Sequence, residues 1–183
     1  MFDRLRIRHR IRHARDVTRD TPEGEITRAT GVVCAVEPVV TSLLVEQPCV
    51  AYRVRATSAG KAEHVSSHQE SVVLTRFAID RGAAGHVIVD GTHALFDLTS
   101  VALPHGIDDR IEHVRLLFGF QALAVSVAES IVSVGAAVSV VGVLVYDPTA
   151  DLGEGEHGFR DELDPVQRLT GDYDHPLLIG EVD

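Results

Sequence analysis

Apolar residues recur at every second position through much of this chain, a period that predicts β-strands. The clearest segment is 128–147, AESIVSVGAAVSVVGVLVYD, in which alternating valines flank Gly135 and Gly142. We interpret Gly135 as part of a turn, and Gly142 as a point where a strand bends or another backbone approaches it. The pattern predicts strands at residues 26–40, 49–57, 70–80, 86–90, 123–130 and 136–146.

The segments between these strands predict turns and one helix. The sequence RGAAG at residues 81–85 has the composition of a tight turn and predicts a hairpin between the third and fourth strands. Residues 58–69 are small and polar and predict another hairpin connection, whereas residues 147–164 read as an acidic, glycine-rich loop. Residues 108–121 carry apolar side chains at helical spacing after an aspartate cap, which predicts a helix between the two halves of the sheet.

These elements favour a mainly β fold with minor α content. We expect either an OB-like small barrel or a strongly curved antiparallel sheet, with one crossing helix. A polar stretch containing Thr-Pro and then glycine precedes the first strand and predicts a boundary. The chain is therefore divided into a basic N-terminal arm and linker at residues 1–24 and a single folded domain at residues 25–183.

The N-terminal arm alternates arginine with apolar residues or histidine. This alternation predicts an extended segment with one charged face, and a helix is the alternative. The candidate contacts of the arm with an anionic partner are Arg4, Arg6, Arg8, Arg10 and Arg12.

Length and composition limit the size of the core and the class of partner. With 183 residues and 45% hydrophobic content, the chain can build one sizeable core. Its net charge of −10 disfavours a broad nucleic-acid surface. The apolar run at residues 114–146 is long enough to cross a bilayer, but Gln121 and Glu129 interrupt it and its Val-x-Val repeats suit strands. We therefore expect no transmembrane segment.

Cysteine content and the start of the chain bear on its location. Cys34 and Cys49 are the only cysteines, which disfavours a disulfide-rich secreted domain. We expect two small buried thiols, with a single bridge between them as the alternative. The basic start of the chain lacks the apolar core of a secretory signal. These features predict a cytoplasmic protein, and the arginine arm leaves peripheral contact with anionic lipid headgroups open.

Four short groups of residues follow one another in a characteristic order. They are Pro48, Cys49, Tyr52 and Arg53; Phe77, Ile79, Asp80, Gly85, Val87 and Val89; Glu129, Gly135 and Gly142; and His175, Pro176, Leu178 and Ile179. This ordered set resembles the GIDE-type domain, also called the BAM (beside-a-membrane) domain. That family supplies the non-RING domain of membrane-embedded mitochondrial RING ubiquitin ligases and stands alone in many prokaryotic proteins. The resemblance covers residues 25–183 and identifies the chain as a divergent stand-alone member.

The resemblance implies a non-catalytic domain for protein interaction or scaffolding. Ligase activity is not implied, because a RING needs about eight cysteine or histidine zinc ligands and this chain has two cysteines. The chain departs from the family pattern at Gln47, Ala51 and Ala136, and its turn between Asp80 and Gly85 is longer. These departures argue against a ligand surface shared with the family more than they argue against the same fold.

Each residue that suggests catalysis or metal binding also has a structural interpretation. His64 and His68 have the spacing of two zinc ligands on one helix face, but a third ligand is missing and solvated histidines are expected. Asp80 and Asp90 are either a carboxylate pair for acid–base chemistry or, as we expect, turn caps. Glu129 is either a catalytic base or a structural residue, and no nucleophile motif accompanies it.

We expect no catalytic residue, metal or cofactor. Arg53 is predicted to form a partly buried ion pair with Asp80 that fixes the barrel seam. The favoured function is a non-catalytic protein-interaction module whose partner the sequence does not identify. One alternative is a single-stranded nucleic-acid-binding OB-like domain, which needs a basic groove and stacked aromatics; aromatic residues make up 5% of the chain and none is tryptophan. The other alternative is an enzyme of unrecognised mechanism.

Overall fold

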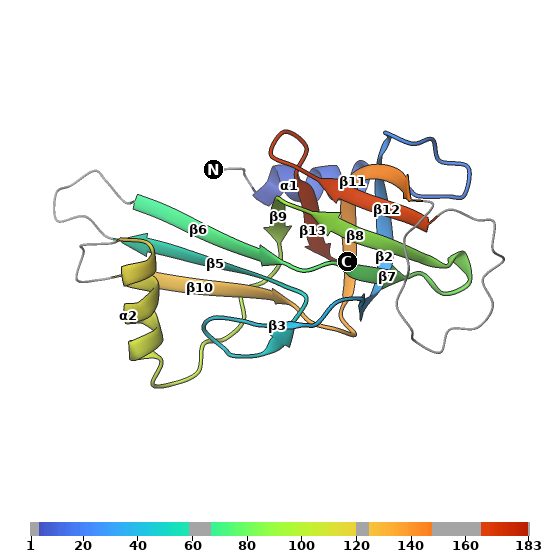
Figure 1. Ribbon diagram of the computed structural model, residues 1–183. Helices are drawn as coiled ribbons and strands as arrows, with labels where there is room; N and C mark the ends of the chain where they lie inside the picture. The colour runs from blue at the N-terminus through green and yellow to red at the C-terminus, as the bar shows by residue number, and fades with distance from the viewer. Residues whose placement is uncertain (1–3, 59–66, 120–124, 148–165, 183) are drawn as a thin grey trace.

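The computed structural model describes residues 4–58, 67–119, 125–147 and 166–182 and shows a mainly β protein with two α-helices in these residues (Figure 1). The helices are α1 (Arg4–His13) and α2 (Asp108–Leu117), with a short 3-10 turn, η1 (Gly82–Ala84). The strands are β1 (Arg15–Asp16), β2 (Ile26–Ala35), β3 (Val40–Thr41), β4 (Pro48–Cys49), β5 (Ala51–Ser58), β6 (Ser67–Leu74), β7 (Phe77–Asp80), β8 (His86–Gly91), β9 (Ala94–Asp97), β10 (Val125–Val132), β11 (Ala137–Asp147), β12 (Val166–Gly171) and β13 (Leu177–Glu181).

Five strands close into a small barrel in the order β2, β7, β8, β12, β11 and back to β2. Neighbouring strands of this ring are antiparallel except β8 and β12, which run parallel. The short strand β1 extends the sheet beside β2, whereas β13 pairs with β11 and β9 pairs with β13. The prediction of a mainly β small barrel is confirmed. Its interior is filled by apolar side chains, including Val33, Phe77, Ile79, Leu144 and Ile179.

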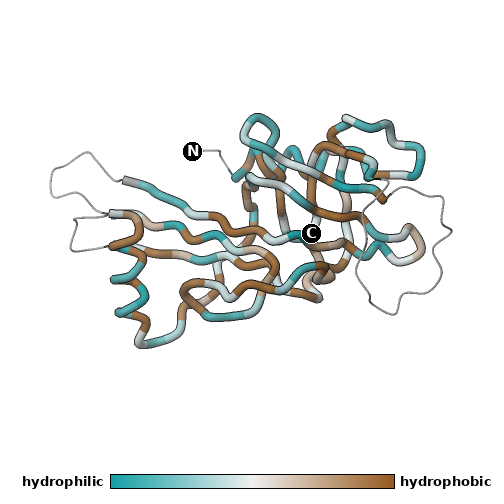
Figure 2. Tube along the Cα trace, viewed as in Figure 1, coloured by the Kyte–Doolittle hydropathy of each residue, from teal (hydrophilic) through white to brown (hydrophobic). Residues whose placement is uncertain are grey.

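A three-stranded antiparallel sheet, β10-β5-β6, extends from one side of the barrel (Figure 1). On one face of this sheet, Leu44, Val54, Ala56 and Val114 form a second apolar core with α2 and the loop after β3. The other face looks toward α1 and β9. Figure 2 shows largely hydrophobic barrel strands and a hydrophilic outer half of β6.

The basic arm forms the helix α1, so the prediction of an extended segment is wrong and the helical alternative is correct. Ile7 and Ile11 are buried against Val141 and Leu178 on the outside of the barrel. The spacing of these isoleucines could not separate the two conformations, because residues four apart share a face in both. In a helix they lie about 6 Å apart along the axis, close enough to fill one apolar patch of the barrel.

Several other boundaries differ from the predicted ones. The predicted strand at residues 70–80 is two strands in different sheets, β6 and β7. The chain turns between them at Thr75, whose backbone N–H and hydroxyl both donate to the carbonyl oxygen of Val50 at 2.9 Å. The position before α2 is Ile107 and makes no side-chain cap bond, so the aspartate cap is also wrong.

The hairpin of β7 and β8 around η1 is confirmed. The strands that the pattern missed include β9, β12 and β13; β9 pairs in parallel with β13, and β12 pairs in parallel with β8. Within the described residues, no helix has the length and apolarity needed to cross a bilayer. The described part of the apolar run at 114–146 is divided among the end of α2, β10 and β11.

Candidate functional site

A groove of about 820 Å³ lies between the three-stranded sheet and the barrel, and we call it the inter-sheet groove. Strands β5, β6 and β10 form one wall, and α1 and β9 form the other. Its apolar lining includes Ile7, Leu95, Phe96 and Ala128. Its charged lining consists of three arginines and one glutamate, Arg4, Arg53, Arg55 and Glu70. An apolar cleft with a few charged groups is the usual form of a ligand site.

Arg53 is buried in this groove, with 5% of its surface exposed. Its Nη1 donates a hydrogen bond to the carbonyl oxygen of Phe96 at 2.8 Å, and the guanidinium carbon lies 5.6 Å from the centre of the Phe96 ring. The Nε and Nη2 atoms are buried and have no hydrogen-bond partner among the described residues. Burial, followed by the charge of Arg55, lowers the pKa of Arg53 to about 10, so the group stays charged at neutral pH.

Asp97, at the end of β9, attaches α1 to the rim of the groove. Its carboxylate is buried and accepts hydrogen bonds from Arg4 Nε at 3.1 Å and from Arg8 Nε at 2.8 Å. Arg4 Nη2 also donates to the carbonyl oxygen of Leu98 at 3.1 Å. All five arginines of the arm are exposed, and among them Arg4 and Arg8 attach the helix to Asp97.

Glu129 lies on the opposite face of the three-stranded sheet from Arg53, because it pairs with Val54 and the faces alternate along β5. It is fully buried. Its Oε1 accepts hydrogen bonds from the backbone N–H groups of Leu43 (2.8 Å) and Leu44 (3.1 Å), and its Oε2 accepts from Leu44 (3.2 Å) and Val45 (2.9 Å). The carboxylate thus joins the loop after β3 to β10. Sequence reasoning did not foresee this contact.

The charge of Glu129 affects two neighbouring groups of the predicted motif. Burial and then the Glu129 carboxylate raise the pKa of Cys49 to about 11 and also raise the pKa of Tyr52. Cys49 is fully buried and Cys34 half-buried, and both thiols are free, so the alternative of a disulfide is wrong. Burial also raises the pKa of Cys34.

The predicted motif residues separate into two groups. One group lies in and around the three-stranded sheet and the adjoining strand β4: Pro48, Cys49, Tyr52, Arg53 and Glu129. The other group belongs to the barrel, its turns and β13: Phe77, Ile79, Asp80, Gly85, Val87, Val89, Gly135, Gly142, His175, Pro176, Leu178 and Ile179. The predicted pair of Arg53 and Asp80 is therefore wrong, because Arg53 contacts β9 and Asp80 caps a turn by accepting a hydrogen bond from the Gly82 N–H at 2.8 Å.

Two glycines of the barrel group show why these positions lack a side chain. Gly135 has φ of +83° in the turn before β11, a conformation that favours glycine. A Cβ at Gly142 would lie 2.7 Å from Leu177 Cδ2 and 2.8 Å from the Thr170 carbonyl oxygen. The predicted close approach of another backbone at Gly142 is confirmed.

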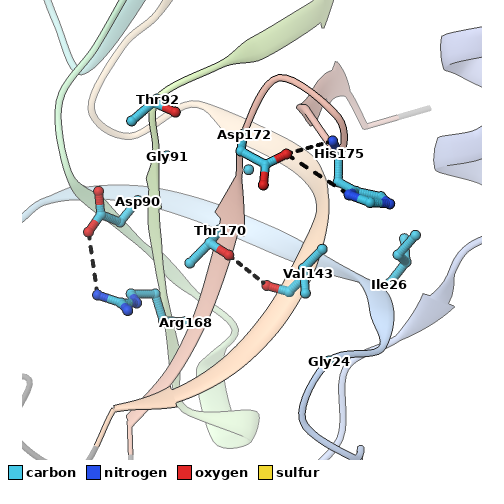
Figure 3. A pocket seen from close by; sticks show the side chains of 11 residues that line it. Gly24, Ile26, Asp90, Gly91, Thr92, Val143, Arg168, Thr170, Asp172 and His175 are labelled. Carbon is cyan, nitrogen blue, oxygen red and sulfur yellow. Dashed lines mark hydrogen bonds and ion pairs between the residues drawn. The ribbon is translucent and has the colours of Figure 1, made fainter.

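A second hollow, of about 560 Å³, opens at one end of the barrel (Figure 3). Arg168 Nη1 lies 3.6 Å from Asp90 and 3.5 Å from Asp147, so Asp90 forms an ion pair and not the expected turn cap. Asp172 accepts a hydrogen bond from the backbone N–H of His175 at 2.7 Å. Figure 3 shows these two groups on different sides of the hollow. Its charged residues are thus largely engaged with one another, which makes it the weaker candidate.

Of the two histidines considered as zinc ligands, one lies in a described strand. His64 lies outside the described residues. His68 is in strand β6, with its Nδ1 3.0 Å from the Thr57 hydroxyl, so a helical zinc-binding spacing is not formed. The described segments contain no group of three or more side chains that could hold a metal ion.

Comparison of the chain with models of known protein families, with curated proteins and with solved structures gives no match. The function is therefore argued from the geometry of the site. The motif drew attention to Arg53, but its neighbours Phe96 and Asp97 were missed. The one signal for them is Asp97 itself, a carboxylate directly after the apolar run of residues 94–96 in a chain with a strongly basic arm.

Proposed function

We propose that this chain is a non-catalytic protein-interaction module that resembles the GIDE/BAM-type domain and has no ligase activity of its own. The observation that favours this function is the edge of β6, on the outer side of the three-stranded sheet (Figure 1). Among the described strands β6 pairs with β5 alone, so the backbone of residues 69–74 has a second edge with no strand beside it. An extended segment of another protein can add to such an edge.

The composition of this edge supports the same function. Natural sheets protect their edges with charges, prolines or bulges. Within residues 69–74 the single charge is Glu70, and the half nearer the barrel, SVVL, has none. The exposed face of α1, with Arg6 and Arg10, offers a second contact to an acidic region of the partner. We place the module in the cytoplasm, where its free thiols remain reduced.

A second candidate, single-stranded nucleic-acid binding, is favoured by the order of the barrel strands. Taken in chain order as first to fifth, they are arranged 1-2-3-5-4-1, which supports an OB-like barrel. OB-folds bind nucleic acid on the face of strands two and three, where aromatic side chains stack on bases. In β7 and β8 the aromatic candidate is Phe77, which is fully buried in the barrel. This observation makes nucleic acid the weaker candidate.

Affinity capture from the native host, with and without nuclease, tests both candidates. The edge variant is Val73→Lys, which adds a charge to the open side of β6. The matched control is Val32→Lys on β2, an exposed strand position paired on both sides. A protein captured by the native chain and the control, lost with Val73→Lys and resistant to nuclease supports the proposal. Capture that is unaffected by Val73→Lys contradicts it, and capture abolished by nuclease favours the second candidate.

A further inference from the structure

The unused hydrogen-bonding capacity of Arg53 lies on one side of its guanidinium group. Nη1 is occupied by the Phe96 carbonyl oxygen, whereas Nε and Nη2 have no hydrogen-bond partner in the part of the chain that the structure describes. These two nitrogens point the same way in the planar group, and together they form the fork that binds two oxygens of a carboxylate or phosphate. A buried charged donor without a partner is costly, so a fork of this kind indicates a missing anionic ligand.

The surroundings of the fork carry excess positive charge. Four arginines lie in or beside the groove: Arg4, Arg8, Arg53 and Arg55. Two carboxylates oppose them, since Asp97 binds Arg4 and Arg8 and Glu70 pairs across the strands with Arg55. Among the described residues, these four positive and two negative charges leave an excess of positive charge, which favours an anionic ligand. No carboxylate of the described segments is hydrogen-bonded to Arg53, whose hydrogen bond goes to the neutral carbonyl of Phe96, although the charges of Glu70 and Asp97 act on it.

The rest of the inter-sheet groove is suited to an apolar body. The half-buried Leu95 lies on the barrel side next to the buried Ile7 and Phe96, and the half-buried Ala128 lines the groove from β10. The volume of about 820 Å³ is in the range of sites for small organic ligands. Arg4 is 47% exposed, so its long side chain can shift and admit a head group to the buried fork.

We propose that the inter-sheet groove binds an amphipathic carboxylate, with its carboxylate on the Nε and Nη2 atoms of Arg53 and its apolar chain between Phe96, Leu95 and Ala128. A carboxylate is the better match than a phosphate, because one fork supplies two donors for two oxygens and the local excess charge is small. This site lies on a face of the three-stranded sheet, whereas the proposed protein partner uses the edge of β6. Either proposal can therefore fail without the other.

Isothermal titration of the full chain tests the proposal with defined probes. Decanoate and octanoate carry both parts of the ligand, 1-octanol carries the chain alone, and acetate carries the head group alone. Decanoate is expected to bind more tightly than octanoate, because each added methylene buries more apolar surface. Both 1-octanol and acetate are expected to bind at least about tenfold more weakly than octanoate, since each lacks one set of contacts.

Three variants connect binding to the groove. Arg53→Lys keeps the charge but loses the planar fork, and is expected to weaken decanoate binding about tenfold. Ala128→Phe fills the groove from its half-exposed wall and leaves residue 53 itself unchanged, so it is expected to abolish binding while the circular dichroism spectrum is unchanged. Arg6→Lys, on the exposed side of α1, is the matched control and should bind like the native chain.

The outcomes separate the proposal from its alternatives. Binding that depends on the head group, the chain and the groove as described supports the proposal. If Arg53→Lys does not fold, Ala128→Phe by itself still tests whether binding depends on the groove. No binding of decanoate, or equal binding by all variants, overturns it. Tighter binding of octyl phosphate than of decanoate also overturns it, because the head group would then be a phosphate.

Discussion

Arg53 and Glu129 are charged residues buried on opposite faces of the same three-stranded sheet, and they differ in how their polar atoms are satisfied. Both oxygens of Glu129 accept backbone hydrogen bonds from the loop after β3. Two of the three guanidinium nitrogens of Arg53 have no partner in the described structure. A fully satisfied buried charge is part of the architecture, whereas a half-satisfied one retains capacity to bind something else. The face with α2 is thus structural, and the face with α1 is the one where we propose that a ligand binds.

The barrel offers a second contrast, because its interior is apolar and its stability depends on close packing. The barrel should therefore be sensitive to substitutions that change side-chain volume. The three-stranded sheet should instead be sensitive to substitutions that leave buried polar groups without hydrogen-bond partners. Substitutions at the two kinds of site should have measurably different costs.

The largest loss of stability is expected for Glu129→Ala. It leaves the N–H groups of Leu43, Leu44 and Val45 without their acceptor, and we expect a loss of about 4 kcal/mol in the free energy of unfolding. Glu129→Gln keeps one acceptor oxygen and is expected to cost about half as much. Urea unfolding followed by circular dichroism measures both. A loss below about 1 kcal/mol for Glu129→Ala would falsify the structural role of this carboxylate.

Gly142→Ala is expected to come next, with a loss of about 3 kcal/mol, because the new Cβ meets the backbone oxygen of Thr170 and cannot displace it cheaply. The matched substitution is Gly135→Ala, where φ is positive but the space is open. That variant suffers only conformational strain and should lose about 1 kcal/mol. Equal losses in the two variants would show that the close approach of β12 to Gly142 has no energetic weight.

The difference between these glycines was partly visible in the sequence. The alternation of apolar residues and the glycine positions predicted β11, the turn before it and the β7–β8 hairpin, because these depend on local period and turn chemistry. The break at Thr75 was not visible, since it depends on a hydrogen bond to Val50, 25 residues away in the chain. The conformation of α1 was predicted wrongly for the same reason, because contacts with Val141 and Leu178 determine it.

The sequence predicted individual residues of the candidate site but not the contacts between them. Arg53 and Glu129 belong to the motif that the sequence displays, but a motif does not say which polar atoms are satisfied. That depends on Phe96 for Arg53 and on the loop at residues 43–45 for Glu129, both of which lie outside the three-stranded sheet and are brought close by tertiary packing. The alternation along β5 placed Arg53 and Arg55 on one face, so the basic side of the sheet was open to inference.

Arg53→Met tests the contrast with Glu129 directly. Methionine keeps much of the length and removes a buried charge with two unpartnered donors, so the loss of one hydrogen bond is offset and the change should stay within about 1 kcal/mol. Arg53→Ala also removes the packing against Phe96 and should cost about 2 kcal/mol. Thermal or urea unfolding of the two variants without ligand gives the comparison. If Arg53→Met costs as much as Glu129→Ala, Arg53 is a structural residue and the contrast between the faces fails.

The smallest effect is expected at the ion pair of Asp16 with Arg28, which joins β1 to β2 outside both cores. The Arg28 Nε donates to Asp16 at 2.7 Å, and this hydrogen bond is the largest cause that lowers the pKa of Asp16 below its ordinary value of 3.8. Because the folded-state pKa is the lower one, the stabilisation is complete above the ordinary value and is lost as the pH falls through the folded-state pKa. Asp16 is 61% exposed, so solvent screening limits the contribution to about 0.3 kcal/mol. Asp16→Asn should therefore cost that amount at pH 7 and nothing at the acid end of the titration. A difference that persists unchanged at pH 2 would mean that packing, and not the charge of Asp16, stabilises this edge of the barrel.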